Sequence, residues 1–378
     1  MTPRRLRLGM VGGGSGAFIG AVHRTAARLD DRYELVAGAF SSSEEVCRAS
    51  AEALHVAPDR AYASFEAMAE AEAARPDGVE AVAVVTPNHL HAAPASALLA
   101  RRIPVLCDKP LTASLEDALS LAALVRSSGA PFAVTYNYSG YPMVRRAREI
   151  VAAGEIGRVR VVQLEYAQDW LAEPVEQAGQ KQASWRTDPA RAGPGGSLGD
   201  IGTHAVHLAK FVTGLGLAAV AADLMSFAPG RVLDDNAHVM LRFEGGARGL
   251  LWTSQVAYGH ANGLTLRVYG ERGALQWRQE APEFLDLTRR GRSTERLQRG
   301  AAGSGAASRL PGGHPEGYLE AFATLYSEFA DQVLAWQGGE PWRPGLTPTA
   351  ADGVEGVRFV DAAVRSSKAG GRWVEIES

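Results

Sequence analysis

The feature that most constrains the fold is a short apolar run that ends in three glycines and opens onto a helical pattern. Residues 6–11 are apolar except for Arg7, residues 12–14 are all glycine, and apolar residues then recur at helical spacing over residues 19–29. In such a strand–turn–helix the first glycine permits a tight turn and the second lets a diphosphate approach the backbone. A small third residue, here Ala17 or Gly20, allows close helix packing. The pattern therefore predicts a dinucleotide site at the start of this helix.

More apolar runs alternate with helical patterns in the first third of the chain. The runs cover residues 33–40, 79–85, 103–107 and 131–136, and helical spacing covers residues 43–54, 91–100 and 115–127. Buried strands of about five residues separated by helices are typical of a parallel sheet with right-handed crossovers. We therefore expect residues 1–140 to form a doubly wound, Rossmann-type α/β domain.

The pattern changes after residue 140. Helical spacing covers residues 143–152 and part of 195–214, and strand-like runs cover residues 159–166, 219–226, 237–243, 247–255, 264–270 and 273–277. Because most of these runs follow one another without a helix between them, residues 141–378 predict an α+β domain with a large, mostly antiparallel sheet. We expect an exposed loop at 287–313 and helices at 316–336 and 349–367, the last of which packs back on the N-terminal domain.

The charge balance and the cysteine count exclude several classes of protein. Lysine and arginine number 39 against 42 aspartates and glutamates, so the basic surplus of a nucleic-acid binder is missing. No apolar stretch reaches the roughly 18 residues of a membrane span. Cys47 and Cys107 are too few for a disulfide framework or a zinc finger, which favours a reducing compartment, the cytoplasm. The basic start of the chain resembles a secretory signal, but the glycine turn that follows favours a first strand.

Two polar motifs follow apolar runs of the first domain. Residues 86–91 read Thr-Pro-Asn-His-Leu-His, and residues 107–110 read Cys-Asp-Lys-Pro. Ligands of a doubly wound sheet lie outside the carboxyl ends of its strands, where both motifs fall. A desolvated lysine such as Lys109 can transfer protons. The alternatives are a surface position for Lys109 and simple packing of His91 at a helix start.

A third motif lies in the glycine-rich segment 193–207. Asp200, His204 and His207 occupy positions i, i+4 and i+7, which share one face of a helix. A carboxylate beside an imidazole suits acid–base chemistry. The trio also has the residue types of a metal site, but zinc needs further well-placed ligands, so we expect no metal. Plain packing of the two histidines is the remaining alternative.

The end of the run 33–40 normally decides between NAD and NADP. An acidic residue there binds the ribose 2′-hydroxyl of NAD, and an arginine accommodates the 2′-phosphate of NADP. This chain has Ser41, Ser42 and Ser43, which suit either cofactor, followed by Glu44, which would oppose a phosphate. The segment favours NAD and leaves NADP open.

Together these motifs resemble the Gfo/Idh/MocA family, which includes glucose–fructose oxidoreductase and inositol dehydrogenase. The order and spacing of the glycine loop and of the segments 86–91, 108–110 and 195–204 match the family over essentially the whole chain. The resemblance implies a Rossmann domain, a C-terminal domain with a large open sheet, and nicotinamide-dependent oxidation or reduction of a sugar, cyclitol or related polyol. It also implies a homodimer or homotetramer, because relatives pair their open sheets. Within the family the chain is most similar to the levoglucosan and glycoside 3-dehydrogenases.

The resemblance also assigns roles to single residues. Lys109 would hold the reacting hydroxyl and assist proton transfer, His204 would be the second acid–base group, and Asp200 would bind substrate hydroxyls and orient His204. The implied cofactor-binding residues are Gly12, Gly14, Ser15, Ala17, Phe18, Ile19, Ser41, Ser42, Thr86, Pro87, Asn88, His91, Asp108 and Lys109. The implied substrate-binding residues are Lys109, Asn137, Tyr138, Trp185, Arg186, Asp200, His204 and His207. For Trp185, packing between domains is an equal alternative.

The chain departs from the family pattern at three places. Asp108 stands where glutamate is usual, and the glycine loop is enlarged. His207 stands where aspartate or asparagine is frequent, so an imidazole replaces a carboxylate or amide at an implied substrate-binding position. Pro110 is expected to follow a cis bond. We expect hydride transfer between NAD(P) and a sugar, glycoside or cyclitol hydroxyl or ketone. The alternatives are a sugar–sugar oxidoreductase with a tightly held cofactor, a keto-sugar reductase, a nicotinamide-binding sensor without turnover, and a metal-dependent hydrolase.

Overall fold

The computed structural model describes residues 4–301 and 307–377. The chain divides into two compact units: unit 1 contains Met1–Asn137 and Tyr318–Val354, and unit 2 contains Tyr138–Gly317 and Glu355–Ser378. The first division lies close to the expected boundary after residue 140. The segment 318–354, which we expected in the C-terminal domain, belongs to unit 1, because its long helix packs against the first helix of the chain.

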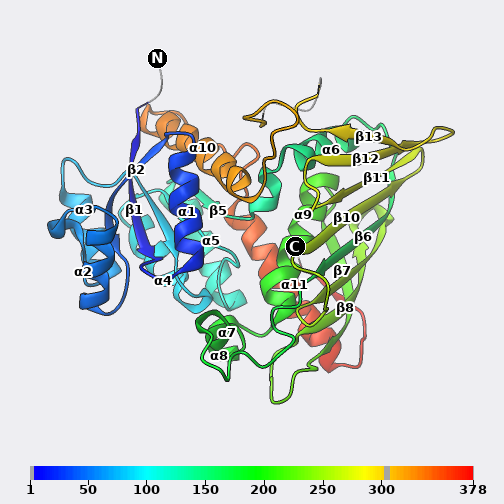
Figure 1. The fold of residues 1–378 in the computed structure, drawn as a ribbon, viewed down its shortest axis with the longest axis horizontal. Coiled ribbons are helices and arrows are strands. Elements are labelled where there is room, and N and C mark those ends of the chain that lie inside the picture. Colours follow the sequence, from blue (N-terminus) through cyan, green and yellow to red (C-terminus); the bar gives the residue numbers. More distant parts are fainter. Residues whose placement is uncertain (1–3, 302–306, 378) are drawn as a thin grey trace. The chain divides into compact units, whose positions relative to one another are not determined.

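Unit 1 is built on a five-stranded sheet with the order β2-β1-β3-β4-β5 (Figure 1). All of its strand pairs are parallel, and β3 is buried along its whole length, as expected for a sheet covered on both faces. The strands are β1 (Leu6–Gly12), β2 (Tyr33–Ala39), β3 (Ala81–Val85), β4 (Val105–Cys107) and β5 (Phe132–Val134). The helices are α1 (Phe18–Leu29), α2 (Glu44–Ala53), α3 (Phe65–Ala74), α4 (Ala92–Leu99), α5 (Leu115–Ser128) and α10 (Tyr318–Gln337).

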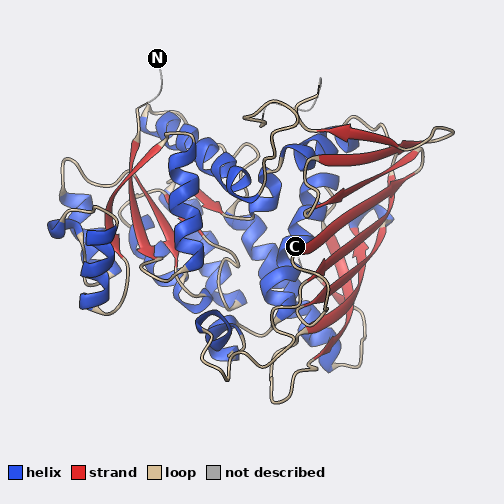
Figure 2. Ribbon diagram, viewed as in Figure 1, coloured by secondary structure: helices blue, strands red, loops and turns tan. Residues whose placement is uncertain are grey.

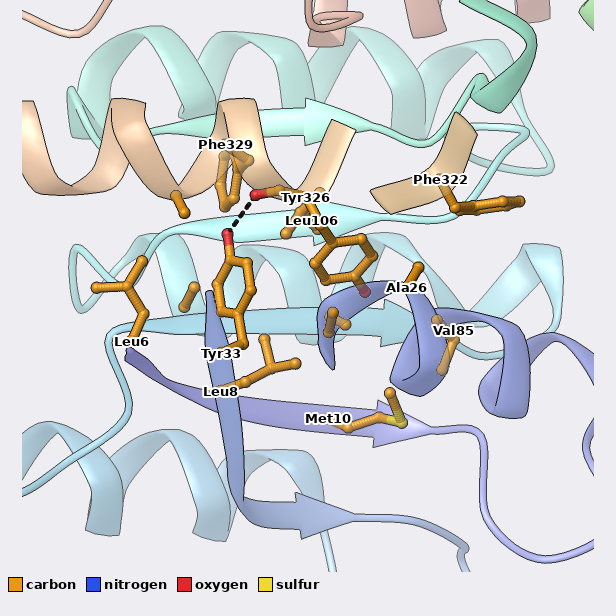
Figure 3. Packing of buried hydrophobic residues seen from close by; sticks show 14 of the residues in the cluster. Leu6, Leu8, Met10, Ala26, Tyr33, Val85, Leu106, Phe322, Tyr326 and Phe329 are labelled. Carbon is orange, nitrogen blue, oxygen red and sulfur yellow. Dashed lines mark hydrogen bonds between the residues drawn. The ribbon is translucent and has the colours of Figure 1, made fainter. Parts of the chain in front are cut away.

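The hydrophobic core of unit 1 joins β1 and β3 to α1 and to the returning helix α10 (Figure 3). From α10, Tyr326 and Phe329 are fully buried in this cluster. The hydroxyl of Tyr33 donates a hydrogen bond to the backbone carbonyl of Tyr326 at 2.9 Å. The core therefore depends on two segments that are almost three hundred residues apart in the sequence.

Unit 2 is built on a nine-stranded sheet with the order β13-β12-β11-β10-β6-β9-β8-β7-β14. Figure 2 draws the strands in red. Its pairs are antiparallel except for β6 with β9, which are parallel. The strands are β6 (Val159–Ala167), β7 (Leu217–Met225), β8 (Asn236–Phe243), β9 (Arg248–Ser254), β10 (Gly263–Gly270), β11 (Gly273–Arg278), β12 (Phe284–Arg289), β13 (Glu295–Gln298) and β14 (Val374–Glu375). The helices are α6 (Pro142–Ala152), α7 (Lys181–Arg186), α8 (Pro189–Ala192), α9 (Thr203–Thr213) and α11 (Ala350–Lys368), whose first residues belong to unit 1.

The expectation of an exposed loop at 287–313 is wrong for part of that segment. Residues 284–289 and 295–298 form β12 and β13, which extend the sheet. Arg299 is 1% exposed, and its guanidinium pairs with Glu283 and Glu316, so this arginine is not part of a solvated face. The alternation of apolar and polar residues in β12 is short, and charged residues follow it, so the sequence pattern did not indicate a strand there. Residues 302–306 lie outside the described residues.

The helical spacing proposed for Asp200, His204 and His207 also needs correction. Residues 198–202 form one turn of π-helix, η4 (Leu198–Gly202), and α9 begins only at Thr203. The N–H of Thr203 donates to the carbonyl of Leu198, five residues back, so the three side chains do not follow a regular α-helical spacing.

In the described part of the chain no helix is long and apolar enough to cross a membrane.

Candidate active site

The glycine loop of unit 1 lies against the ends of two neighbouring strands. Gly12 has a φ of +80°, a conformation that favours glycine, and a Cβ there would meet Thr86 and the carbonyl of Val85. In the first turn of α1, a Cβ on Gly20 would lie 2.4 Å from the carbonyl oxygen of Gly13. Gly20, rather than Ala17, therefore makes the close helix approach expected of the third small residue.

The start of α1 differs chemically from the starts of α2, α3 and α5. The side chains of Ser43, Ser64 and Ser114 cap α2, α3 and α5 by accepting a backbone N–H. At α1 the capping position is Ala17, which has no side-chain acceptor, and the first turn carries no acidic residue. The first N–H groups of α1 and its positive dipole end thus remain available to an anion, which fits the diphosphate of NAD.

The residues expected at the cofactor differ in what they already contact. The N–H of Ser15 donates to the Ser50 hydroxyl at 3.0 Å, and Phe18 is 66% exposed beside it. At the end of β2, the Ser41 hydroxyl accepts the N–H of Ser43, while Ser42 is exposed. The polar atoms of Ser42 are therefore the more accessible to a ribose.

His91 joins the loops that follow β3 and β4. Its Nδ1 lies 2.8 Å from the carbonyl oxygen of Pro110, and its Nε2 lies 2.8 Å from that of Thr86. The ring is 1% exposed, and burial lowers its pKa, although the Asp108 charge and the carbonyl contacts act against this shift. His91 therefore connects the two loops, because each of its ring nitrogens contacts a backbone carbonyl oxygen. This agrees with the packing alternative.

Asp108 organises the turn that carries Lys109. Its Oδ1 accepts the N–H of Lys109 at 2.9 Å and the hydroxyl of Thr135 at 2.8 Å. Burial alone would raise the pKa of Asp108, but the close His23 ring and the charges of Lys109 and His91 outweigh it and hold that pKa well below its ordinary range. Asp108 thus acts on the loop as an ionised carboxylate. The Lys109–Pro110 bond is cis, as expected.

In unit 2, Asp200 lies among polar side chains from several elements. Its Oδ2 accepts a hydrogen bond from Gln255 Nε2 at 3.0 Å and lies 3.4 Å from Arg186 Nε. The Arg186 guanidinium also stacks on the ring of Trp185, 4.2 Å from its centroid. These contacts bring together three of the residues expected at the substrate, and they join α7 to η4.

His204 lies against two tyrosine rings. The Tyr138 ring is perpendicular to the imidazole with 4.9 Å between centroids, and the Tyr166 ring lies 6.3 Å away. Burial and the charge of Asp200 raise the pKa of Tyr138, although its hydrogen bonds with Tyr166 and Asn262 act against this. The half-buried Asp200 and the buried His204 therefore both lie near Tyr138. His207, 7% exposed, stacks instead on Phe211.

A network of amides links these residues and was not foreseen from the sequence. The Tyr166 hydroxyl donates to Asn262 Oδ1 at 2.9 Å, and Gln168 Nε2 donates to the same oxygen at 2.8 Å. Gln255 in turn donates to Gln168 and to Asp200. Each amide sits at the end or the start of a strand: Gln168 follows β6, Gln255 follows β9 and Asn262 precedes β10. Polar residues at three strand ends are the signal that would have found them.

Asp234 anchors the segment that carries Asp200. Its carboxylate accepts the N–H of Gly196 at 2.6 Å, the hydroxyl of Ser197 at 2.8 Å and the N–H of Leu198 at 2.8 Å. Burial raises the pKa of Asp234, and these three donors act against the shift. A Cβ on Gly196 would meet the carbonyl oxygen of Asp234 at 2.1 Å, so glycine is required there.

One further residue expected at the substrate, Asn137, has a buried donor. Asn137 is 1% exposed, and within residues 4–301 and 307–377 its Nδ2 has no hydrogen-bond partner. In the same residues no three His, Cys, Asp or Glu side chains are grouped as metal ligands.

Comparison with known proteins assigns both halves of the chain. Residues 6–136 match the oxidoreductase family with an NAD-binding Rossmann fold, and residues 144–276 match the GFO/IDH/MocA C-terminal domain. The uncharacterized oxidoreductase YfiI of Bacillus subtilis is 33% identical over 98% of this chain and 97% of its own. Levoglucosan dehydrogenase of Pseudarthrobacter phenanthrenivorans is 27% identical over 99% and 98%.

A solved structure shows the same likeness. The inositol dehydrogenase homolog of Azotobacter vinelandii, complexed with NADH and myo-inositol, matches with a TM-score of 0.90 and 37% identity, over 98% of each chain. The chain therefore belongs to the GFO/IDH/MocA family of oxidoreductases, with an NAD-binding Rossmann domain at its N-terminus.

Proposed function

We propose that the protein oxidises a secondary hydroxyl of a cyclitol, sugar or glycoside with NAD, or reduces the corresponding ketone. The observation that carries this proposal is a group of polar side chains in unit 2, in a chain whose N-terminal part matches an NAD-binding Rossmann family. The half-buried Asp200 and Gln168 both contact the buried amide of Gln255, and His204 is buried nearby. Such a mixture of a carboxylate, amides and an imidazole offers donors and acceptors to several hydroxyls of one substrate.

We assign the roles as follows. Lys109 holds the reacting hydroxyl and takes up its proton, and its positive charge stabilises the developing alkoxide. His204 is the second acid–base group, and Asp200 binds substrate hydroxyls. NAD, when bound, accepts the hydride that leaves the same carbon, so the substrate loses a proton and a hydride and becomes a ketone.

Two features support the choice of cofactor and substrate. Glu44 and Glu45 follow the serines at the end of β2 and would repel a 2′-phosphate, which favours NAD over NADP. Relatives named for levoglucosan and inositol indicate a ring that carries several hydroxyls.

A substrate screen tests the proposal. The purified protein is incubated with NAD or NADP and with myo-inositol, levoglucosan, free sugars or simple glycosides, and reduced cofactor is followed by its absorbance. We expect turnover of at least one polyol, with a higher kcat/KM for NAD. NADH binding without turnover of any polyol would contradict the proposal and favour a sensor.

We further propose that the protein is a homodimer or homotetramer of the cytoplasm. On β8 and β9, Met240 and Leu250 are paired neighbours, and they are 48% and 51% exposed. A second copy of the open sheet would cover such an apolar surface. Both cysteines are free and buried, which suits a reducing compartment.

A further inference from the structure

A buried chain of three polar side chains lies behind Lys109 in unit 1. Tyr326 comes from α10, His23 from α1, and Asp108 directly follows β4. Their exposed fractions are 0%, 0% and 8%. Polar groups of this kind are costly to bury unless each one meets a partner, so their contacts show what they do.

The His23 ring lies between the other two members. Its Nδ1 is 2.8 Å from the Tyr326 hydroxyl, and its Nε2 is 3.8 Å from Asp108 Oδ1, a distance that suits an electrostatic contact rather than a full hydrogen bond. The same Oδ1 accepts the N–H of Lys109 and the hydroxyl of Thr135. One carboxylate oxygen thus connects His23 to the turn that carries Lys109.

The protonation pattern of His23 follows from its neighbours. A carboxylate only accepts hydrogen bonds, so Nε2 must carry a proton to face Asp108 favourably. Burial and the Asp108 charge raise the pKa of Tyr326 well above its ordinary value, so the phenol keeps its proton. That hydroxyl can donate to Nδ1 and thereby select the tautomer whose proton is on Nε2.

We propose that His23 is a positioning residue for Lys109 and acts through Asp108. The Tyr326 hydroxyl fixes the tautomer of His23, the Nε2–H faces and steadies the Asp108 carboxylate, and this carboxylate holds the amide of Lys109. Because Lys109 directly follows Asp108, a rotated carboxylate would change the point from which the lysine side chain extends. The helix α10 thereby contributes to the chemistry through the hydroxyl of Tyr326. The inference rests on the proposed role of Lys109.

Two substitutions distinguish the effect of the His23 N–H donor from the effect of its packing. His23→Gln keeps an N–H that can face Asp108, and His23→Leu fills the space without one. With a polyol found by the screen, we expect His23→Leu to lose roughly 10- to 100-fold in kcat with little change in the KM for NAD, and His23→Gln to recover most of that loss. Equal losses in the two variants would overturn the proposal.

Tyr33→Phe is the matched control for a loosened α10. It removes another buried hydroxyl that bonds this helix, through the carbonyl of Tyr326 (Figure 3). It leaves the His23 side chain in place. We expect a lower melting temperature and a kcat within about twofold of the wild type. A kcat as low as that of His23→Leu would show that the anchoring of α10, not the His23 donor, is what matters, and would overturn the proposal.

Nitrogen NMR of protein labelled at histidine tests the tautomer without turnover. The His23 signals are those that disappear in His23→Gln. We expect a proton on Nε2, and an unprotonated Nε2 would overturn the inference. If the wild type turned over no polyol, the proposed function would fail, while a protonated Nε2 would still support the chain from Tyr326 to Asp108.

Discussion

The turn after β4 depends on the ionised carboxylate of Asp108. It holds the N–H of Lys109 and the hydroxyl of Thr135, and His23 faces it from α1. Because these contacts favour the charged form, the pKa of Asp108 is lowered in the folded protein. In the unfolded chain it returns to about 3.9. Below that pH the Asp108 carboxylate binds a proton in the unfolded chain but stays ionised in the folded protein.

Asp108→Asn tests this linkage between charge and stability. The contribution of Asp108 is fully present above its unfolded pKa and is lost as the pH falls toward the folded pKa, at up to about 1.4 kcal/mol per pH unit. The difference in the free energy of unfolding between wild type and Asp108→Asn should therefore shrink on acidification from about pH 5 to about pH 3. Urea titrations at several pH values measure it, and a constant difference would speak against an ionised Asp108.

Residue types at the ends of strands could be predicted, but their partners could not. The sequence places Thr86, Asp108 and Lys109 at carboxyl strand ends, and they lie there. It does not show that His91 commits both ring nitrogens to backbone carbonyls. It also does not show that Tyr326 reaches the turn through His23, because that contact joins residues three hundred positions apart.

At the scale of elements, Asp234 anchors the glycine-rich segment that precedes α9, although Asp234 itself belongs to a different part of the chain. Its carboxylate replaces the missing intrahelical partners of Gly196 and Leu198 and binds the Ser197 hydroxyl. The π-turn that carries Asp200 starts at this anchor. The position of Asp200 therefore depends on a residue from the loop before β8.

Asp234→Ala should destabilise the protein and displace this turn. Three hydrogen bonds to a buried carboxylate are lost, and we expect a loss of about 3 kcal/mol in the free energy of unfolding, together with a raised KM for the polyol. Asp188→Ala is the control, because Asp188 caps the short helix α8 with one bond to Ala190 and should cost about 1 kcal/mol. Equal losses in urea denaturation would argue against Asp234 as the anchor.

Element types could be predicted where the apolar period was long. The Rossmann strands and both long C-terminal helices lie close to their expected ranges. The helix α3 was missed, because its alanines and glutamates give little apolar periodicity. The π-turn was missed, because a regular spacing of Asp200 and His204 looks the same in sequence whether or not one turn is widened.

At the scale of the whole molecule, the surface of the nine-stranded sheet leads to a prediction about assembly. Over most of β8 and the first part of β9, exposed residues alternate with buried ones, and Met240 and Leu250 are among the exposed ones. The helices α9 and α6 also contact the sheet of unit 2. If a second copy covers this exposed face, charges placed there will prevent pairing.

The double variant Met240→Glu, Leu250→Glu should therefore run as a monomer in light scattering coupled to gel filtration, while the wild type runs as a dimer or tetramer. Leu119→Glu is the control, because Leu119 is a comparably exposed leucine on α5, in unit 1. An unchanged mass for the double variant would place the interface elsewhere.

The central claim is that Lys109 moves the proton of a polyol hydroxyl in an NAD-dependent oxidation. The most direct measurement compares wild type and Lys109→Met for NADH formation with the polyol from the screen, and for NADH binding by fluorescence. We expect a loss of about 10²- to 10⁴-fold in kcat, with a change in the Kd for NADH that is small by comparison. A near-normal kcat in Lys109→Met would contradict it.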